Sequence, residues 1–351
     1  MSQVITVKGV SKPYDCIIGS GVISLLREKI KDVTKAKKIL VVTDDNVDLL
    51  YGNRITELLT EGGFVCCKYV FSNGEENKNM ETVTNILEFA MENQISRSDC
   101  IIALGGGIVG DVAGFCASIC LRGIDFIQIP TTFLAAIDSS VGGKTGVNLR
   151  GGKNLAGAFY QPKLVICDTD FLNTLSPEIF SDGTAEAIKY GVIFDKSLFE
   201  KLRKDFSDDI ENIISRCIYL KAQVVSQDEF DTGRRQLLNF GHTIGHAIEK
   251  CSNFTISHGR AVAIGMVMAS RGAYKMGYTD KDNSIEIAKI LNNNNLPVSS
   301  SFDIENLLDV MVRDKKRQGE EITLVIPEKI GKCVLKTIPV NSLKEFLKCA
   351  L

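Results

Sequence analysis

Residues 100–121 constrain the fold of this chain more than any other segment. An apolar run, Cys100–Leu104, ends in Gly105-Gly106-Gly107-Ile108-Val109-Gly110-Asp111, and a helical pattern follows over Asp111–Leu121. The glycines fit the spacing Gly-x-Gly-x-x-Gly, in which absent side chains let backbone N–H groups approach a pyrophosphate at a helix N-terminus. The stretch is about long enough to span a bilayer, but its glycines and the acidic Asp111 favour a buried strand, a turn and a helix. We therefore predict a nucleotide-binding turn and no membrane span, with a purely structural glycine turn as the alternative.

A nucleotide site of this kind needs an acidic partner for the ribose. The residue about 20 positions after the turn is Asp125, which begins a strand instead of ending one. Asp44 follows the strand candidate Ile39–Thr43 and is the better ribose partner.

Apolar runs and amphipathic stretches alternate through the first half of the chain. The strand candidates are Ile39–Thr43, Phe64–Val70, Cys100–Leu104, Phe126–Pro130 and Leu164–Asp168, and the helix candidates are Val47–Glu61, Glu81–Asn93 and Asp111–Leu121. This order predicts βαβ units in a Rossmann-like, mostly parallel sheet. A Gly-, Ser-, Lys- and Asn-rich segment, Ile137–Tyr160, is too long for a simple connection, so we predict a functional loop there.

Helical periodicity dominates after Leu175. The helix candidates are Asp182–Phe194, Ile210–Val225, Leu237–Lys250, Gly259–Met276 and Ser284–Asn292, followed by a strand pair near Ile322–Ile326 and Cys333–Ile338. We therefore expect an α/β protein of two domains: an NAD-binding α/β domain over residues 1–175, and a mainly helical metal- and substrate-binding domain over residues 176–351.

Charge and cysteine content exclude several classes of protein. A formal net charge of −2 gives no long-range attraction to nucleic acid or to an anionic membrane. Met1–Val10 lacks the apolar run of a secretory signal. The eleven cysteines lie mostly in apolar runs and include no Cys-x-x-Cys pair. We therefore expect a cytoplasmic protein with reduced thiols and no thiolate zinc site.

The three histidines of the chain all lie in one short segment. His242 and His246 are four residues apart, on one face of a predicted helix, and His258 begins the next helix. Glu186 lies between apolar neighbours on an earlier helix, with Lys189 one turn later; a surface ion pair is the alternative for those two. Glu186 and two histidines would form a three-ligand zinc site with an open fourth position. The i,i+4 spacing by itself favours His242 and His246 as the two histidine ligands.

Gly-Gly-Lys occurs twice in the long segment, ending at Lys144 and at Lys153. Glycines that expose backbone N–H groups beside an ammonium suit a phosphate or a carboxylate. The spacing of a Walker loop is absent. Further cations are Arg122, Lys221, Arg234, Arg235 and the run Arg313-Asp314-Lys315-Lys316-Arg317, for which a solvated face is an equal alternative.

In this order and spacing, over roughly residues 40–330, these motifs resemble the 3-dehydroquinate synthase family. They are the glycine turn, Asp138–Gly146, Gly152-Lys153-Asn154, Ala185–Gly191, Gly241–Glu249 and His258-Gly259. The resemblance implies an NAD- and metal-dependent phosphate lyase of the shikimate pathway of aromatic amino-acid biosynthesis. Its substrate would be 3-deoxy-D-arabino-heptulosonate 7-phosphate, and its products 3-dehydroquinate and phosphate. The implied reaction oxidises a ring hydroxyl transiently, eliminates phosphate, reduces the ketone and recloses the ring, so that NAD is restored in each turnover.

The resemblance also implies a role for individual residues. Zn²⁺, or Co²⁺ as an alternative, would be held by Glu186, His242 and His258. Catalysis and substrate contacts would come from Lys144, Lys153, Asn154, Lys189, Lys221, Arg235, Asn239, His246, Arg122 and Asp138, with one lysine of Lys315-Lys316. NAD would be lined by Asp44, Glu75, Lys78, Gly107, Ile108, Val109, Gly110, Asp111, Thr131, Thr132, Lys144, Lys153, Phe171, Leu172, Asn173 and Thr174. The expected partner is a small sugar phosphate, with no nucleic acid or membrane, and the expected assembly is a homodimer.

Three motifs depart from the form usual in that family. Asn73 stands where the family has Asp before Gly-Glu, Glu229-Phe230-Asp231 replaces Glu-Arg-Glu, and Arg260 replaces the Glu of His-Gly-Glu. A cation at Arg260 opposes the dipole of the helix that begins there. We expect Arg260 to be tolerated and not to bind substrate, because other cations suffice for one phosphate and one carboxylate.

Three rival functions are compatible with parts of the sequence. An iron-type alcohol or glycerol dehydrogenase needs no phosphate cluster, so both Gly-Gly-Lys elements count against it. A sister cyclase such as 2-deoxy-scyllo-inosose synthase is disfavoured by the intact segment Asp138–Gly146. A catalytically inactive NAD-binding protein is disfavoured because all three expected metal ligands are present.

Overall fold

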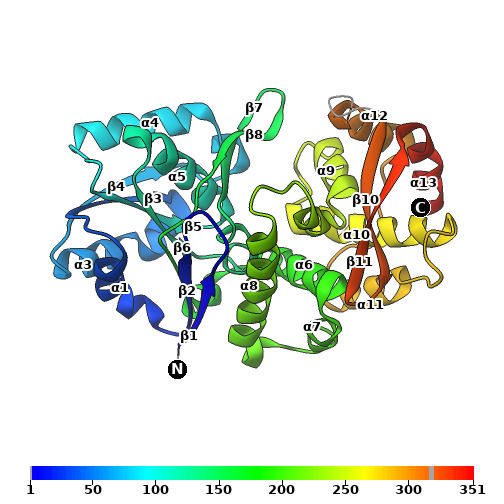
Figure 1. Ribbon diagram of the computed structural model, residues 1–351, viewed down its shortest axis with the longest axis horizontal. Helices are drawn as coiled ribbons and strands as arrows, with labels where there is room; N and C mark the ends of the chain where they lie inside the picture. The colour runs from blue at the N-terminus through cyan, green and yellow to red at the C-terminus, as the bar shows by residue number, and fades with distance from the viewer. Residues whose placement is uncertain (1, 316–319) are drawn as a thin grey trace. The chain divides into compact units, whose positions relative to one another are not determined.

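The computed structural model describes residues 2–315 and 320–351 and divides into two compact units (Figure 1). Unit 1 comprises residues 1–175 with residues 214–230, and unit 2 comprises residues 176–213 with residues 231–351. Most of helix α8 (Ile210–Gln227) therefore belongs to unit 1, although it follows the first part of unit 2 in the sequence. The assignment of NAD to one half of the chain and of metal and substrate to the other stays a prediction.

Unit 1 is built on a seven-stranded sheet with the order β1-β2-β9-β6-β5-β3-β4. The strands are β1 (Gln3–Val7), β2 (Tyr14–Gly19), β3 (Lys38–Asp44), β4 (Val65–Phe71), β5 (Cys100–Gly105), β6 (Asp125–Pro130) and β9 (Leu164–Asp168). Every neighbouring pair is parallel except β1–β2. The predicted mostly parallel sheet is confirmed. The sequence patterns missed β1 and β2; β1 is an edge strand that alternates between half-buried and exposed residues and so lacks a long apolar run.

Helices cover both faces of this sheet. The core of one face joins α1 (Leu26–Val33) and α3 (Asn53–Glu61) to alternate strand residues such as Val41 and Ile102. The core of the other face joins α4 (Met80–Glu92) and α5 (Gly107–Ile119) to the residues between them, such as Val42 and Ile101. Successive side chains of a strand point to opposite faces, which explains why these strands are apolar throughout.

Two predictions for unit 1 need correction. The expected helix Val47–Glu61 is three pieces, α2 (Asp45–Val47), the π-helical turn η2 (Asp48–Gly52) and α3, and at this turn Asp48 forms an ion pair with Lys68. The expected loop Ile137–Tyr160 is largely an antiparallel hairpin of β7 (Lys144–Leu149) and β8 (Gly152–Phe159). Gly146 and Gly157 face each other in this ladder, and a Cβ on Gly157 would lie 2.1 Å from the Thr145 carbonyl oxygen. The glycines that indicated a loop thus permit close strand pairing.

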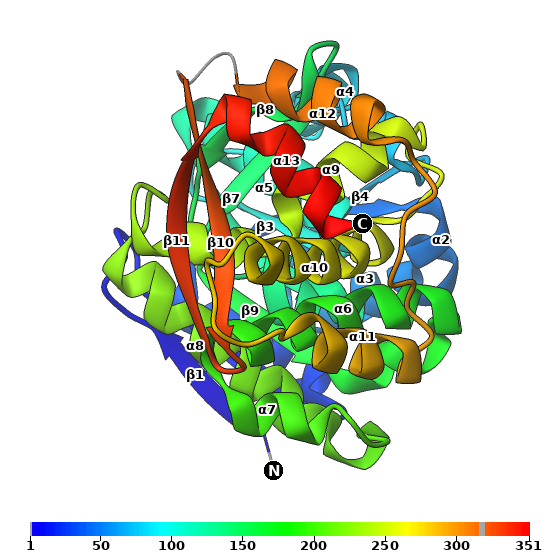
Figure 2. The same ribbon diagram turned by 90° about the vertical axis from the view of Figure 1, so that its right-hand side faces the viewer.

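Unit 2 is mainly helical, as predicted. Its helices are α6 (Pro177–Phe194), α7 (Lys196–Lys201), α9 (His242–Cys251), α10 (His258–Lys275), α11 (Ser284–Asn293), α12 (Ile304–Lys315) and α13 (Leu343–Ala350), and β10 (Glu321–Lys329) pairs with β11 (Lys332–Pro339). Most residues of α10 are buried, and it packs against α6, α9, α11 and α13 (Figure 2). These four helices are therefore arranged around α10.

Two helix starts in unit 2 differ from those predicted by more than one residue. Helix α6 begins at Pro177, because the Ser176 hydroxyl accepts the backbone N–H of Ile179 and proline suits the first helical position. The expected helix Leu237–Lys250 is split into the 3₁₀ turn η8 (Arg234–Asn239) and α9, because Gly241 has φ of 77°. A Cβ at Gly241 would lie 2.6 Å from Cγ of Met266, so close contact with α10 also requires glycine there.

Residues 100–121 form the predicted strand, turn and helix, as β5 and α5. No helix in the described part of the chain combines the length and the apolarity needed to cross a membrane.

Candidate functional site

The glycine turn of unit 1 lies at the C-terminal ends of β5 and β3, which are neighbours in the sheet. In the sheet, β4 lies beside β3 on one side, and β6 lies beside β5 on the other side. The strand that follows β3 and the strand that follows β5 are therefore added in opposite directions. Open parallel sheets bind ligands where the strand order reverses in this way. Gly106 is the N-cap of α5, and no side chain caps the helix among the described residues. Its first backbone N–H groups can therefore donate hydrogen bonds to a phosphate.

Asp44 ends β3 beside this turn. Its carboxylate accepts the backbone N–H of Val47 at 2.9 Å and so caps α2. Burial raises the pKa of Asp44 above its usual value. A ribose hydroxyl that donates to this carboxylate would compensate for part of its desolvation.

Thr131 and Thr132 follow β6 next to the turn. The backbone N–H of Thr131 donates to the Gly105 carbonyl at 3.0 Å. Its hydroxyl is buried and has no hydrogen-bond partner among the described residues. A buried hydroxyl of this kind is expected to have a partner, which a bound nucleotide would supply.

The four residues of the segment Phe171–Thr174 differ in solvent exposure. Phe171 and Leu172 are buried, and the Phe171 ring packs against Tyr51 with centroids 4.5 Å apart. Asn173 and Thr174 are exposed, and the Thr174 hydroxyl lies 2.6 Å from the Tyr51 hydroxyl. Of the four, only the last two have exposed side chains.

A chain of polar contacts runs beside the turn. The Lys78 ammonium is buried and donates to Asp111 and to the Asn154 side-chain oxygen, each at 2.6 Å. Burial raises the pKa of Asp111, while Lys78 acts in the opposite direction. Asn154 has a positive φ of 54°, which brings its side chain toward Lys78. The three residues therefore hold one another in place.

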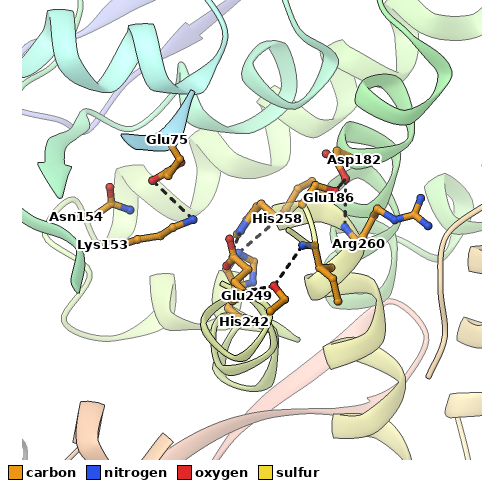
Figure 3. Close-up of polar contacts among 12 residues, drawn as sticks. Glu75, Lys153, Asn154, Asp182, Glu186, His242, Glu249, His258 and Arg260 are labelled. Atoms are coloured by element: carbon orange, nitrogen blue, oxygen red, sulfur yellow. Dashed lines mark hydrogen bonds and ion pairs between the residues drawn. The ribbon is translucent and has the colours of Figure 1, made fainter. Parts of the chain in front are cut away.

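Asn148 extends this chain, and sequence reasoning missed it. Its side-chain oxygen accepts the Asn154 backbone N–H at 2.9 Å, and its amide nitrogen donates to Glu75 at 2.7 Å. Glu75 also lies 3.7 Å from the Lys153 ammonium (Figure 3). The only sequence signal for Asn148 was its position between the two Gly-Gly-Lys elements.

The remaining expected residues of unit 1 lie in three places. Lys221 is buried on α8 and donates to Asp138, both to the carbonyl oxygen at 2.6 Å and to the carboxylate. Lys144 is exposed at the first residue of β7. Arg122 is exposed beyond the C-terminal end of α5, about 20 Å from the glycine turn along the helix. The structure therefore does not bring Arg122 to the turn within this unit.

Glu186, His242 and His258 come together in unit 2 (Figure 3). Oε1 of Glu186 lies 3.4 Å from Nε2 of His242 and 3.2 Å from Nε2 of His258. Ligands at 2.0–2.2 Å from a tetrahedral zinc ion are about 3.3–3.6 Å apart. The two distances from Glu186 therefore suit one zinc ion, and all three donor atoms lie within 4.8 Å of one another.

The second nitrogen of each imidazole is also engaged. Nδ1 of His242 lies 3.1 Å from the Phe240 carbonyl oxygen, and Nδ1 of His258 lies 3.3 Å from the Glu249 carboxylate. Such contacts orient metal-bound histidines and fix Nε2 as the ligand atom. Glu249 was not expected from the sequence, although it lies seven residues after His242 and hence on the same face of α9.

The two histidines have opposite pKa shifts. Burial lowers the pKa of His242 to about 3, so its ring is neutral at neutral pH. Burial acts in the same direction on His258, but hydrogen bonds to Glu186 and Glu249 outweigh it and raise its pKa to about 10. Both rings must be neutral to bind a metal ion, so a metal has to displace a proton from His258.

Lys189 and His246 lie next to these three residues. The Lys189 ammonium is 2.5 Å from Oε2 of Glu186, and both side chains are almost fully buried. The alternative of a surface ion pair is therefore excluded.

The His246 ring is 5.4 Å from that of His242, and His246, Glu249 and His258 form a second group of residues that could hold a metal ion. The first group fits better, because Glu186 is buried whereas His246 is exposed.

Two expected substrate residues lie on η8, and the first three residues of the basic run, 313–315, end α12. Arg235 is buried and Asn239 is exposed. Lys315 ends α12, and Lys316 lies outside the described residues.

Comparison with known proteins gives the family. The 3-dehydroquinate synthase N-terminal family model matches residues 68–182, and the C-terminal model of the same family matches residues 183–317. A 3-dehydroquinate synthase of Clostridium beijerinckii is 46% identical over 332 residues, which cover 93% of this chain and 95% of that protein. The chain belongs to the 3-dehydroquinate synthase family.

Two solved structures have the same fold as this member of the family. A 2-deoxy-scyllo-inosose synthase complexed with carbaglucose-6-phosphate, NAD⁺ and Co²⁺ has a TM-score of 0.87 at 27% identity, with 99% of this chain and 100% of that one covered. A 2-epi-5-epi-valiolone synthase of Streptomyces hygroscopicus with NAD⁺ and Zn²⁺ bound has a TM-score of 0.87 at 25% identity, with 99% of each chain covered.

Two of the three departures from the family motifs have local explanations. Asn73 donates its backbone and side-chain N–H groups to Asp45, at 3.0 and 2.8 Å, so an aspartate there would place two carboxylates together. Phe230 packs edge-on against Phe159, with ring centroids 5.4 Å apart. Neither departure alters an expected metal ligand or substrate lysine.

Proposed function

We propose that this protein is a 3-dehydroquinate synthase that uses NAD and one divalent metal ion. It would convert 3-deoxy-D-arabino-heptulosonate 7-phosphate to 3-dehydroquinate and phosphate. The observation that carries the proposal is the 46% identity to a 3-dehydroquinate synthase over 93% of this chain. A cytoplasmic location and a homodimeric assembly belong to the same proposal.

The metal assignment is supported by the donor set of unit 2. Glu186, His242 and His258 would hold Zn²⁺ or Co²⁺, the ions that the two solved relatives carry. Lys189 would keep one oxygen of Glu186 engaged, so that the other faces the histidines. Three protein ligands leave a position for a substrate oxygen.

The NAD assignment is supported by the turn of unit 1. The open N-terminus of α5 would take the pyrophosphate, Asp44 a ribose hydroxyl, and the Thr131 hydroxyl a further polar atom. Lys78 would keep Asp111 ionised beside this turn.

When bound, NAD supplies a reversible hydride acceptor and the metal supplies a Lewis acid for the reacting oxygen. The residues of the chain bind and orient the substrate. Lys144, Lys153, Lys221 and Arg235 would bind its phosphate and carboxylate. Lys221 and Arg235 suit this role because they are buried, so little solvent screens their charge. Asp138 and Glu75 would hold Lys221 and Lys153 until substrate replaces those contacts.

We assign the proton transfer that accompanies elimination to the substrate phosphate, because no separate strong base was indicated by the motifs.

A sister cyclase activity is the second candidate, because the 2-deoxy-scyllo-inosose synthase shares the fold. Its identity of 27% is well below the 46% of the 3-dehydroquinate synthase relative, so the dehydroquinate reaction is favoured. An inactive NAD-binding protein is disfavoured because Glu186 lies at distances suited to zinc from the donor nitrogens of both His242 and His258.

The deciding experiment supplies two substrates in parallel to the purified, Zn²⁺-loaded protein with catalytic NAD. Phosphate release and product formation are measured with the heptulosonate phosphate and with glucose 6-phosphate. Turnover of the first substrate alone supports the proposal. Turnover of the second alone would assign the sister activity, and turnover of neither would refute both.

A further inference from the structure

Helices α6 and α10, which carry Glu186 and His258, are in close backbone contact at Asp182 and Gly259. A Cβ atom on Gly259 would lie 2.4 Å from both the Cα atom and the carbonyl oxygen of Asp182. No side chain fits there without moving the helices, because both atoms belong to the backbone. This contact sets how closely the helices pack, but it does not set how α10 is rotated or where its first turn lies.

Asp182 supplies that second constraint from α6 (Figure 3). Its Oδ1 accepts a hydrogen bond from the Ser257 hydroxyl at 2.6 Å and another from the backbone N–H of Arg260 at 3.2 Å. Ser257 is the N-cap residue of α10, yet it makes no side-chain cap bond of its own. Asp182 therefore caps the first turn of α10 from a different helix.

The two residues that Asp182 binds lie on either side of the proposed ligand His258. Asp182 is also four residues before Glu186, hence one turn away on the same face of α6. Two successive turns of α6 therefore contact the start of α10. Asp182 binds the backbone around His258, and Glu186 lies 3.2 Å from the ring of the same histidine.

We propose that Asp182 is a positioning residue of the metal site: by capping α10 from α6, it holds Nε2 of His258 at ligand distance from Glu186. The inference rests on the metal site proposed above. Without Asp182, the first turn of α10 would have to be ordered when the metal binds, at the expense of affinity. Outer contacts of this kind typically change metal affinity about 10–100-fold.

The chain contains a matched control for this cap. Asp195, at the other end of α6, accepts the Ser197 hydroxyl at 2.6 Å and the backbone N–H of Leu198 at 3.2 Å, and so caps α7. It is buried in unit 2 and lies nine residues after Glu186, about 13 Å along the helix axis. Its loss should cost stability to a similar degree without disturbing the metal ligands.

The test compares Asp182→Ala, Asp182→Asn and Asp195→Ala in the full chain. Zn²⁺ affinity is measured by competition with a chromogenic chelator, the ligand geometry by the visible spectrum of the Co²⁺-loaded protein, and stability by the Tm of the metal-free protein. Asp182→Ala should weaken Zn²⁺ binding about 10–100-fold and alter the Co²⁺ spectrum. Asp182→Asn keeps the acceptor oxygen and should stay within about threefold of the wild type. Asp195→Ala should lower Tm while affinity and spectrum stay unchanged.

A wild-type affinity and spectrum in Asp182→Ala would overturn the inference and leave the metal site intact. A wild-type protein that binds neither Zn²⁺ nor Co²⁺ stoichiometrically would instead overturn the metal site itself. Should Asp182→Ala fail to fold, Ser257→Ala removes the shorter of the two hydrogen bonds and should weaken Zn²⁺ binding about three- to tenfold. An unchanged affinity in that variant would also refute the role of Asp182.

Discussion

The Glu249 carboxylate lies 3.3 Å from Nδ1 of His258, on the side of the ring away from the nitrogen that faces Glu186. Glu249 is buried, so this contact is poorly screened by water. A carboxylate behind a metal-bound histidine fixes the ring and makes it a stronger ligand. We predict that Glu249→Ala raises the Kd for Zn²⁺ about 10–100-fold, and that Glu249→Gln, which keeps an acceptor oxygen, has a smaller effect. Equilibrium dialysis measures both; equal Kd values in the wild type and the alanine variant would exclude this role.

Metal binding should release about one proton per ion near neutral pH, because His258 is protonated in the metal-free protein. Its pKa is raised to about 10, whereas that of His242 is lowered to about 3. Below about pH 10 the metal must displace the His258 proton, so affinity should increase by up to about tenfold per pH unit as the pH rises from 6 to 8. Calorimetric titration in buffers of different ionisation enthalpy counts the protons. A metal affinity that does not change over this pH range would show that His258 is already neutral before the metal binds.

Loss of a proposed metal ligand should remove the metal but not NAD. Glu186→Gln and His258→Ala each leave two ligands, which is too few to hold Zn²⁺ at ordinary concentrations. NAD binding should persist, because its expected contacts belong to unit 1. Metal analysis after dialysis, with fluorescence titration of NADH as the folding control, separates the two effects. A variant that keeps its metal and near-normal turnover would show that the residue is not a ligand.

Phosphate release should far exceed any accumulation of NADH. In the proposed reaction NAD is reduced and then reoxidised within one turnover, so absorbance at about 340 nm should stay nearly constant while phosphate accumulates. Simultaneous recording of absorbance and phosphate checks this. NADH that grows in proportion to product would move the protein to the dehydrogenases.

Arg260→Glu, which restores the residue usual in the family, should leave kcat/KM within about tenfold, or under ~1.4 kcal/mol. The Arg260 side chain points away from His258, and its charge attracts Asp182 and Glu178 of α6 (Figure 3). A glutamate would repel both carboxylates, so we expect a lower Tm, with Arg260→Gln in between. Steady-state kinetics and thermal unfolding measure the two effects. A loss of a hundredfold or more, mainly in KM, would show instead that Arg260 binds substrate.

Local sequence determined the elements of this protein where a pattern has a short-range cause. The apolar run Cys100–Leu104 and the glycines after it predicted β5, the turn and α5, because strand burial and the start of a helix are encoded within a few residues. The same reasoning gave wrong results where a glycine served a distant contact. The glycines of Ile137–Tyr160 suggested a loop, but Gly146 and Gly157 permit close strand pairing.

The metal site shows the same contrast between local sequence patterns and contacts made by distant residues. Helical spacing placed His242 and His246 on one face of a helix and so favoured them as the pair of ligands. The structure instead sets His242 and His258 around Glu186, at 3.4 and 3.2 Å. That pairing depends on how closely α10 approaches α9 and α6. A Cβ on Gly265 would lie 2.0 Å from the Gly241 carbonyl oxygen, and one on Gly259 would lie 2.4 Å from Asp182.

Residue type therefore determined which side chains of this chain can bind a metal ion, and tertiary packing decided which of them meet. The spacing of residues along one helix fixes only their relative directions, at about 100° per residue. Which helices lie side by side, and at what level, depends on backbone contacts between residues far apart in sequence. Asp182 and Glu249 gain their positions next to His258 only through those contacts.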